Sequence, residues 1–208
     1  MNFPLMIDLK NKNILVLGGG KMACKRIKKL IKYEPNIKII AKEFDDKIFK
    51  LQEKYYKNIT IVKKTYDKKF IDKSYFLIIA ALNDKKLNEE ISQIASEKNI
   101  LINNMSDFKN GDVIFPAFLD EEDIKISICT SGGSPSLSKQ LKKEIKKLID
   151  DELKDKLREL KELRCFLKNK LDEDKRHKIL KKASKMNLKE ILDLKKELKH
   201  EIEDWNKR

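Results

Sequence analysis

Five short apolar runs alternate with stretches of helical spacing over the first half of the chain. The runs predict strands at residues 14–17, 37–41, 59–62, 76–82 and 100–103, and helices are predicted over 21–32, 44–56 and 87–98. The run at 76–82, FLIIAAL, is apolar without a break, which is typical of a strand buried on both faces of a parallel sheet. The alternation predicts a doubly wound α/β domain with a parallel sheet.

The pattern changes after Gly111. Two strand-like runs, 113–119 and 124–129, are joined by an acidic turn with no helix between them, which predicts an antiparallel hairpin. Beyond it, leucines keep helical spacing to the end of the chain, so the tail is predicted to be helical. We therefore expect an α/β domain over 1–111, a hairpin segment over 112–138 and a helical domain over 139–208. Residues 3–9 are interpreted as an edge strand or a lead-in.

A glycine turn follows the first predicted strand in the stretch NILVLGGGKMA. Gly18, Gly20 and Ala23 occupy the small-residue positions of G-x-G-x-x-G/A, the fingerprint of a Rossmann-like dinucleotide-binding domain. The first glycine permits the turn, the second allows a pyrophosphate to approach the backbone, and Ala23 permits close packing of helix and strand. The amides of Lys21 and Met22, with that of Ala23, are predicted to point at the phosphates.

An acid follows the second predicted strand at the spacing expected for a ribose ligand. Glu43, with Phe44 beside it, lies where a carboxylate would bind the adenosine ribose and favour NAD, although Lys42 leaves room for NADP and Glu43 can equally be a solvated loop acid. Because ligands bind beyond the carboxyl ends of parallel strands, Ala81 and residues 104–107 are predicted at the same edge. We expect NAD to bind there.

The charge balance is strongly basic, with a formal net charge of +14. Such a field can attract nucleic acid or a polyanionic small molecule. The lysines are interleaved with acids and do not form a block with aromatic residues, which favours a solvated surface and argues against a nucleic-acid partner.

No apolar run approaches the length of a membrane span, and the first residues lack the pattern of a secretion signal. Cys24, Cys129 and Cys165 are odd in number and widely spaced, which suits reduced thiols in a cytoplasm, and we expect all three to be small core residues. No cluster of His and Cys is present in the sequence, so no metal site is predicted.

Asp107, in the stretch NNMSDFKNGD, is the best candidate for chemistry. It follows the fifth predicted strand at the edge where the cofactor is expected, and an acid there can take a proton as a hydride leaves. The alternative is an Asx-turn residue. From the residues alone, the two interpretations are equally good.

The order of motifs resembles the precorrin-2 dehydrogenase/siroheme synthase family, in its NAD-dependent dehydrogenase and sometimes ferrochelatase module. The matching pieces are FPLMIDLKNKNILVLGGGKMACKR, IIAALNDKKLNEEI, ILINNMSD, FPAF and ISICTSGGSPSLSKQLKKEI, which cover most of residues 3–145 in the family's order. The chain departs from the family in a loop that is one residue shorter between Gly133 and Ser134, and in Leu82 at a position where the family often has Thr.

The resemblance implies an oxidoreductase of siroheme and porphyrin biosynthesis that uses NAD to oxidise precorrin-2 to sirohydrochlorin. The family's catalytic aspartate falls on Asp107, and its substrate-binding residues fall on Asn104 and Ser131. It also implies a homodimer formed through the hairpin, with a polycarboxylate substrate. Two alternatives stay open: a bifunctional enzyme that also acts as sirohydrochlorin ferrochelatase, and a non-catalytic NAD-sensing regulatory module, which would have no need for Asp107.

Overall fold

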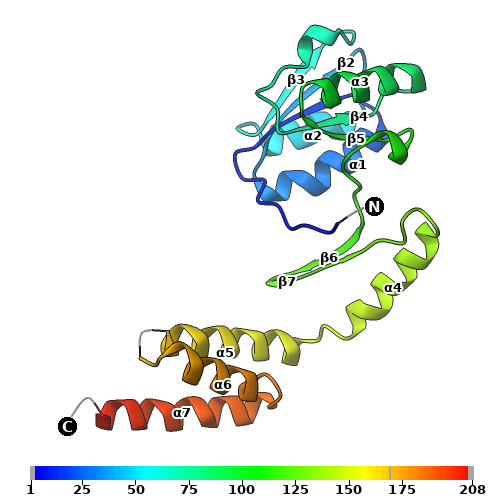
Figure 1. Ribbon diagram of the computed structural model, residues 1–208. Helices are drawn as coiled ribbons and strands as arrows, with labels where there is room; N and C mark the ends of the chain where they lie inside the picture. The colour runs from blue at the N-terminus through cyan, green and yellow to red at the C-terminus, as the bar shows by residue number, and fades with distance from the viewer. Residues whose placement is uncertain (1–2, 169, 206–208) are drawn as a thin grey trace. The chain divides into compact units, whose positions relative to one another are not determined.

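The computed structural model describes residues 3–168 and 170–205, and the chain folds as two compact units, Met1–Phe115 and Pro116–Arg208. The first unit is built on a five-stranded sheet in which every neighbouring pair is parallel (Figure 1). The strand order is β3-β2-β1-β4-β5. The strands are β1 (Asn13–Leu17), β2 (Asn36–Ala41), β3 (Ile59–Lys63), β4 (Leu77–Ala80) and β5 (Leu101–Asn104). The predicted doubly wound α/β domain is confirmed.

Helices cover both faces of this sheet because its strands are apolar on both faces. Ile14 and Val16 of β1 pack in one core with α1 (Lys21–Leu30) and α2 (Asp46–Lys54). Leu15 and Leu17, which alternate with them, pack in the second core with α3 (Lys85–Glu97). The connections include three 3₁₀ turns, η1 (Ile31–Tyr33), η2 (Lys68–Phe70) and η3 (Phe108–Asn110).

The N-terminal stretch 3–9 forms no strand and is a lead-in to the sheet. Phe3, Leu5 and Met6 are largely exposed, and only Leu9 packs against the core on the α1 face. Its alternative interpretation as an edge strand is wrong, because β3 and β5 form the two edges of the sheet.

The second unit begins with an antiparallel hairpin of β6 (Ala117–Glu121) and β7 (Ile124–Ile128), against which α4 (Pro135–Lys147) packs. The hairpin starts later than predicted, because Val113 and Phe115 pack instead against the core on the α1 face of the first unit. Three further helices, α5 (Asp151–Leu167), α6 (Glu173–Ala183) and α7 (Leu188–Trp205), pack together. Their shared core is formed by Leu163, Leu167, Ala183 and Leu198.

The cysteines correct one prediction. Cys24 is buried as expected, but Cys129 and Cys165 are exposed, because Cys129 lies beyond the end of β7 and Cys165 lies on the outer face of α5. All three are free thiols.

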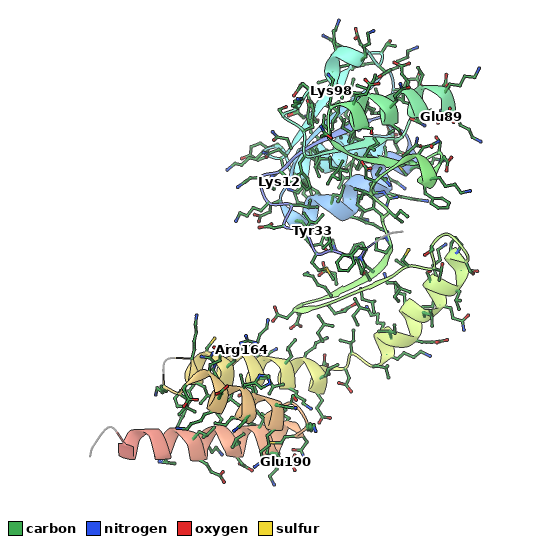
Figure 2. All side chains as sticks on the ribbon, viewed as in Figure 1. Lys12, Tyr33, Glu89, Lys98, Arg164 and Glu190 are labelled. Carbon is green, nitrogen blue, oxygen red and sulfur yellow. The ribbon has the colours of Figure 1, made fainter. Side chains whose placement is uncertain are left out.

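Charged residues lie on the outside of both units. Figure 2 labels Lys12 and Glu89 on the first unit and Arg164 and Glu190 on the second, all of them exposed. Positive and negative side chains are interspersed, as the sequence predicts for a solvated surface. Among the helices in the described part of the chain, none is long and apolar enough to cross a membrane.

Candidate functional site

The glycine turn after β1 is fixed by the approach of a neighbouring strand end. Gly18 has a φ of +124°, and a Cβ on it would lie 2.3 Å from the carbonyl oxygen of Ala81, directly after β4. The amide of Gly18 donates to the carbonyl of Ile40 in β2 at 2.9 Å. Only glycine tolerates this combination of backbone conformation and contact, so the predicted role of Gly18 in the turn is confirmed.

Gly19 has an equally strict requirement that the sequence pattern does not reveal, because the fingerprint treats its position as variable. A Cβ there would lie 2.2 Å from the carbonyl oxygen of Glu43 and 2.8 Å from the ring of Phe44. The carbonyl of Gly19 in turn accepts a hydrogen bond from the amide of Asp45 at 2.8 Å. The loop after β2 is thereby held against the glycine turn.

The N-terminus of α1 differs from those of the other α-helices in the described part of the chain. Gly20 is its N-cap, with no side-chain cap, and the first turn contains no acid. The other helices are each capped by a side chain, namely Asp45, Asp84, Ser134, Asp150, Asp172 and Asn187. The amides in the first turn of α1 and the helix dipole are the features that attract an anion to a helix start.

Space for a phosphate exists at this helix start. A Cβ built on Gly20 meets no atom within 4 Å, whereas those built on Gly18 and Gly19 would lie 2.3 and 2.2 Å from backbone oxygen atoms. Lys21 and Met22 are exposed beside the open position, and Ala23 is buried against the sheet. The turn therefore fits a pyrophosphate approaching Gly20, with the amides of Lys21, Met22 and Ala23 as donors.

The other predicted cofactor residues lie at the same edge of the sheet. Glu43 is exposed in the loop after β2, where its carboxylate is free to meet a ribose. Phe44 is partly buried and stacks edge-on against Phe49, with ring centroids 5.7 Å apart. Ala81 follows β4 and faces Gly18 through its carbonyl. These residues can hold the adenosine half of a dinucleotide that begins at the pyrophosphate site.

Asp107 follows β5 at the carboxyl edge of the sheet, as predicted. Its Oδ1 accepts a hydrogen bond from the amide of Lys109 at 2.9 Å, and its Oδ2 accepts one from Nδ2 of Asn110 at 3.2 Å. The side chain therefore does cap the 3₁₀ turn η3, as the Asx-turn interpretation expects. A carboxylate has about four acceptor positions, so these two contacts leave it able to accept a proton from a ligand.

A buried amide network behind Asp107 was not predicted from the sequence. Asn104 Oδ1 accepts from the amides of Ser106 and Asp107 at 2.9 and 3.1 Å, which fixes the turn that carries the carboxylate. Asn104 Nδ2 donates to Oγ of Ser92 and to the carbonyl of Asn88, both on α3. Asn104 is thus buried within the fold and positions Asp107, rather than presenting its side chain to the surface.

Asn88 is the centre of this network and is fully buried. Its Oδ1 accepts from the amide of Leu82 at 3.1 Å, and its Nδ2 donates to the carbonyl of Leu82 at 2.8 Å and to Oγ of Ser106. One side chain therefore ties the end of β4 to the turn after β5. A polar residue on the inner face of a predicted amphipathic helix is the signal that could have identified it.

We expect Asn88→Ala to lower the free energy of unfolding by about 1–3 kcal/mol, because the buried amide and carbonyl of Leu82 lose their partners. Urea unfolding without ligands measures this loss. Gln93→Ala on the same helix is the control, since Gln93 is exposed and its side chain donates to the exposed Glu97. We expect this control to change stability by less than about 0.5 kcal/mol. Equal effects of the two substitutions would contradict the role given to the network.

Two titratable groups of the first unit are shifted by burial. Burial, assisted by Asp45, raises the pKa of the Cys24 thiol, so Cys24 stays protonated behind the glycine turn. Burial, together with the nearby Glu90 carboxylate, raises the pKa of Tyr66 to about 12. The Tyr66 hydroxyl donates to Glu90 at 3.4 Å and is a structural donor on the α3 side of the sheet.

Ser131 belongs to the second unit, in the turn between β7 and α4. It is exposed and has a left-handed φ of +49°, next to Gly132 with a φ of +81°. Thr130 closes this turn, since its Oγ1 accepts from the amide of Ser134, the N-cap of α4. No group of three or more His, Cys, Asp or Glu side chains in the described part of the chain is arranged to hold a metal ion.

Comparison with known proteins agrees with the geometry of the first unit. A sequence model of a protein family described as "Putative NAD(P)-binding" matches residues 5–117. The dinucleotide site at the carboxyl edge of the sheet therefore has support both from the fold and from the family.

Curated relatives extend the similarity along the chain. A protein of Methanocaldococcus jannaschii named "Putative precorrin-2 dehydrogenase" is 30% identical over 208 residues, covering 97% of both chains. Proteins named "Siroheme synthase" are 28% identical over 140 residues in Mannheimia succiniciproducens and 32% over 142 residues in Zymomonas mobilis. Each match covers 67% of this chain, which spans 29% of the length of those two synthases.

One solved structure has the same fold over almost the whole chain. The protein described as "SirC, precorrin-2 dehydrogenase" matches with a TM-score of 0.75 and 24% sequence identity, covering 97% of this chain and 99% of the other. The parallel sheet, the hairpin and the helical tail are thus one known architecture.

Proposed function

This chain belongs to the NAD(P)-binding family of the precorrin-2 dehydrogenases and siroheme synthases, and we propose that it oxidises precorrin-2 to sirohydrochlorin with NAD as the hydride acceptor. The reaction removes two electrons and two protons from precorrin-2. One hydride passes to NAD, and the remaining proton passes to a base on the protein. Precorrin-2 oxidation would place the enzyme in siroheme and porphyrin biosynthesis.

One arrangement carries this proposal. The uncapped start of α1 at Gly20 and the carboxylate of Asp107 lie at the same edge of one parallel sheet, beyond β1 and β5. The first can bind the phosphates of a dinucleotide, and the second can receive a proton from a substrate beside the nicotinamide. A module that only senses NAD would need the helix start to bind the dinucleotide and would need Asp107 only as the cap of η3.

The chain's own residues have distinct parts in the reaction. The amides of Lys21, Met22 and Ala23 hold the pyrophosphate, and the bound dinucleotide supplies the hydride acceptor. The Asp107 carboxylate takes the proton at whichever of its oxygens faces the substrate. Asn104 keeps that carboxylate in place through the amide of Asp107 and acts from within the core. Of the two substrate-binding residues that the family resemblance implies, we keep Ser131 in that role.

NAD is preferred over NADP because of Glu43. An exposed carboxylate after β2 can accept hydrogen bonds from the ribose hydroxyls, and it would repel the 2′-phosphate of NADP. Lys42 beside it weakens that repulsion, so the preference is expected to be incomplete.

We also propose a homodimer, with the β6–β7 hairpin at its interface. A two-stranded sheet has only marginal stability by itself, and the outer edges of β6 and β7 are not paired with another strand. A second copy of the chain could pair with one of these edges. Light scattering measures the mass in solution.

The remaining proposals concern partners and location. The net charge of +14 would attract a polycarboxylate substrate, and we propose neither a nucleic-acid nor a membrane partner. The three free thiols are compatible with the reducing conditions of the cytoplasm, where we place the enzyme.

The test is an anaerobic absorption spectrum of the purified protein mixed with precorrin-2 and NAD, without added metal. Sirohydrochlorin and NADH should appear together in equal amounts. The oxidation should be slower when NADP replaces NAD. Addition of ferrous ion to the same cuvette then tests the bifunctional alternative, since a ferrochelatase would convert the product to siroheme. Bound NAD without any turnover, in folded protein, would favour the NAD-sensing alternative.

A further inference from the structure

Arg26, in the second turn of α1, is a partly buried cation for which the fold provides no anion. Its guanidinium lies over the ring of Phe115, 4.0 Å from the ring centroid. In the described part of the chain no carboxylate is within ion-pair distance of it, and its buried Nε has no hydrogen-bond partner. Burial lowers the pKa of the Arg26 guanidinium from its ordinary value.

A second unsatisfied atom lies against the same segment of chain. Asn103 is buried in β5, and its Oδ1 has no partner, while its Nδ2 donates to the carbonyl of Val113 at 2.7 Å. Because Asn104 bonds to α3, its neighbour Asn103 faces the opposite side of the sheet, where α1 packs. Arg26 Nε and Asn103 Oδ1 are the two buried side-chain atoms in the described residues without a partner, and both flank residues 113–115.

Unpaired buried polar groups lower the stability of a fold, but they can bind a ligand that supplies the missing partner. Buried polar groups are normally paired, and a desolvated guanidinium without a carboxylate is a rare exception. The Phe115 ring holds the planar group in one orientation. A guanidinium held in this way can donate to both oxygens of a carboxylate.

The position also suits the proposed substrate. Arg26 lies roughly 9 Å along the axis of α1 from Gly20, at 1.5 Å per residue. The strand beside residues 113–115 is β5, which carries Asp107 after its end. A tetrapyrrole with acid side chains on every ring can present one ring to Asp107 and a carboxylate from another ring to a cation elsewhere on the same unit.

We propose that Arg26, held on Phe115, binds a carboxylate of the tetrapyrrole substrate and thereby orients the ring that reacts. The inference rests on the proposed function and adds a specificity-determining residue to it. Arg26 binds the substrate periphery and takes no part in the proton or hydride transfer. Its contribution therefore belongs to substrate affinity, with little effect on kcat.

The test compares Arg26→Gln with Lys25→Gln, which removes the same charge from an exposed position on the same helix. We expect Arg26→Gln to raise KM for precorrin-2 roughly tenfold to a hundredfold, with kcat within threefold of the wild type and an unchanged Kd for NAD. Arg26→Lys should recover part of the affinity. Phe115→Leu, which keeps the cation and removes its aromatic platform, should raise KM several-fold.

A binding measurement without turnover completes the test. Sirohydrochlorin carries the same acid side chains as precorrin-2, so its Kd, measured by fluorescence without NAD, should rise in parallel with KM. If Arg26→Gln matches Lys25→Gln in both constants, the inference is wrong. If Arg26→Gln instead dissociates an oligomer without altering either constant, a protein carboxylate is the partner, and the inference is wrong again. A folded wild type that cannot oxidise precorrin-2 would reject the proposed function itself.

Discussion

Asp107→Asn should lower kcat for precorrin-2 oxidation by roughly a hundredfold to ten-thousandfold, the range lost when a general base is removed. The amide oxygen of asparagine can still accept from the amide of Lys109, so η3 keeps its cap. The contact with Nδ2 of Asn110 is exposed and at 3.2 Å, and its loss should cost little stability. Kd for NAD should stay within twofold of the wild type, because Asp107 is not part of the proposed phosphate site at α1.

The same chain offers a matched control for this substitution. Asp67 caps the 3₁₀ turn η2 in the same way as Asp107 caps η3, with Oδ1 accepting from the amide of Lys69 at 2.9 Å. Asp67→Asn should therefore cause the same small change in thermal stability and leave kcat unaltered. If folded Asp107→Asn turns over at a rate within threefold of the wild type, Asp107 is only a turn residue.

The two interpretations of Asp107 that the sequence left open turn out to be compatible. The fold uses the carboxylate as a cap, and the cap holds it at the sheet edge where the proposed reaction would need a base. Asn104 adds to this by fixing the backbone amide of Asp107 from within the core. A sequence pattern cannot distinguish a catalytic acid from a capping acid at a strand end, because both functions require the same residue at the same place.

The sheet was predictable because each strand carries its own signal. All four residues of β4 are buried, and in β1 every residue after Asn13 is buried. Burial on both faces of the sheet therefore explains their apolar runs. The glycine fingerprint was predictable because its spacing marks a strand, a turn and a helix in sequence, although Gly18 is also required by the approach of the distant Ala81 carbonyl. The predicted hairpin was correct in type, but its predicted start was too early. Val113 and Phe115 are apolar because they pack against the core of the first unit, and they are not part of the hairpin.

The missed features depend on contacts between segments distant in sequence. Gly19 is required because the loop after β2 passes over it, and Asn88 is required because it faces Leu82 and Ser106 across the sheet edge. Arg26 is one of many basic residues in a chain with 48 Lys and Arg, and what distinguishes it is the combination of its stacking on Phe115 with a buried Nε that has no partner. Such pairings appear once the tertiary fold is known.

Gly20→Val should abolish NAD binding while leaving the fold intact, with Kd rising by on the order of a hundredfold or more. Gly20 has an extended backbone with a φ of −80°, and a Cβ there meets no protein atom within 4 Å, so valine can be accommodated in the free protein. Its branched side chain would then fill the space that the pyrophosphate needs. Valine is a poorer N-cap than glycine, and we expect a stability loss of about 1 kcal/mol.

Gly18→Ala provides the contrast, because the two glycines are separated by a single residue and are required for opposite reasons. The new Cβ would lie 2.3 Å from the carbonyl of Ala81, in a backbone conformation that L-residues rarely adopt. Thermal and urea unfolding should therefore show a loss of about 4 kcal/mol or more. Calorimetric titration with NAD, on variants shown to be folded by circular dichroism, separates the two effects. If Gly20→Val binds NAD with wild-type affinity, the phosphates do not approach α1, and the site must be placed elsewhere.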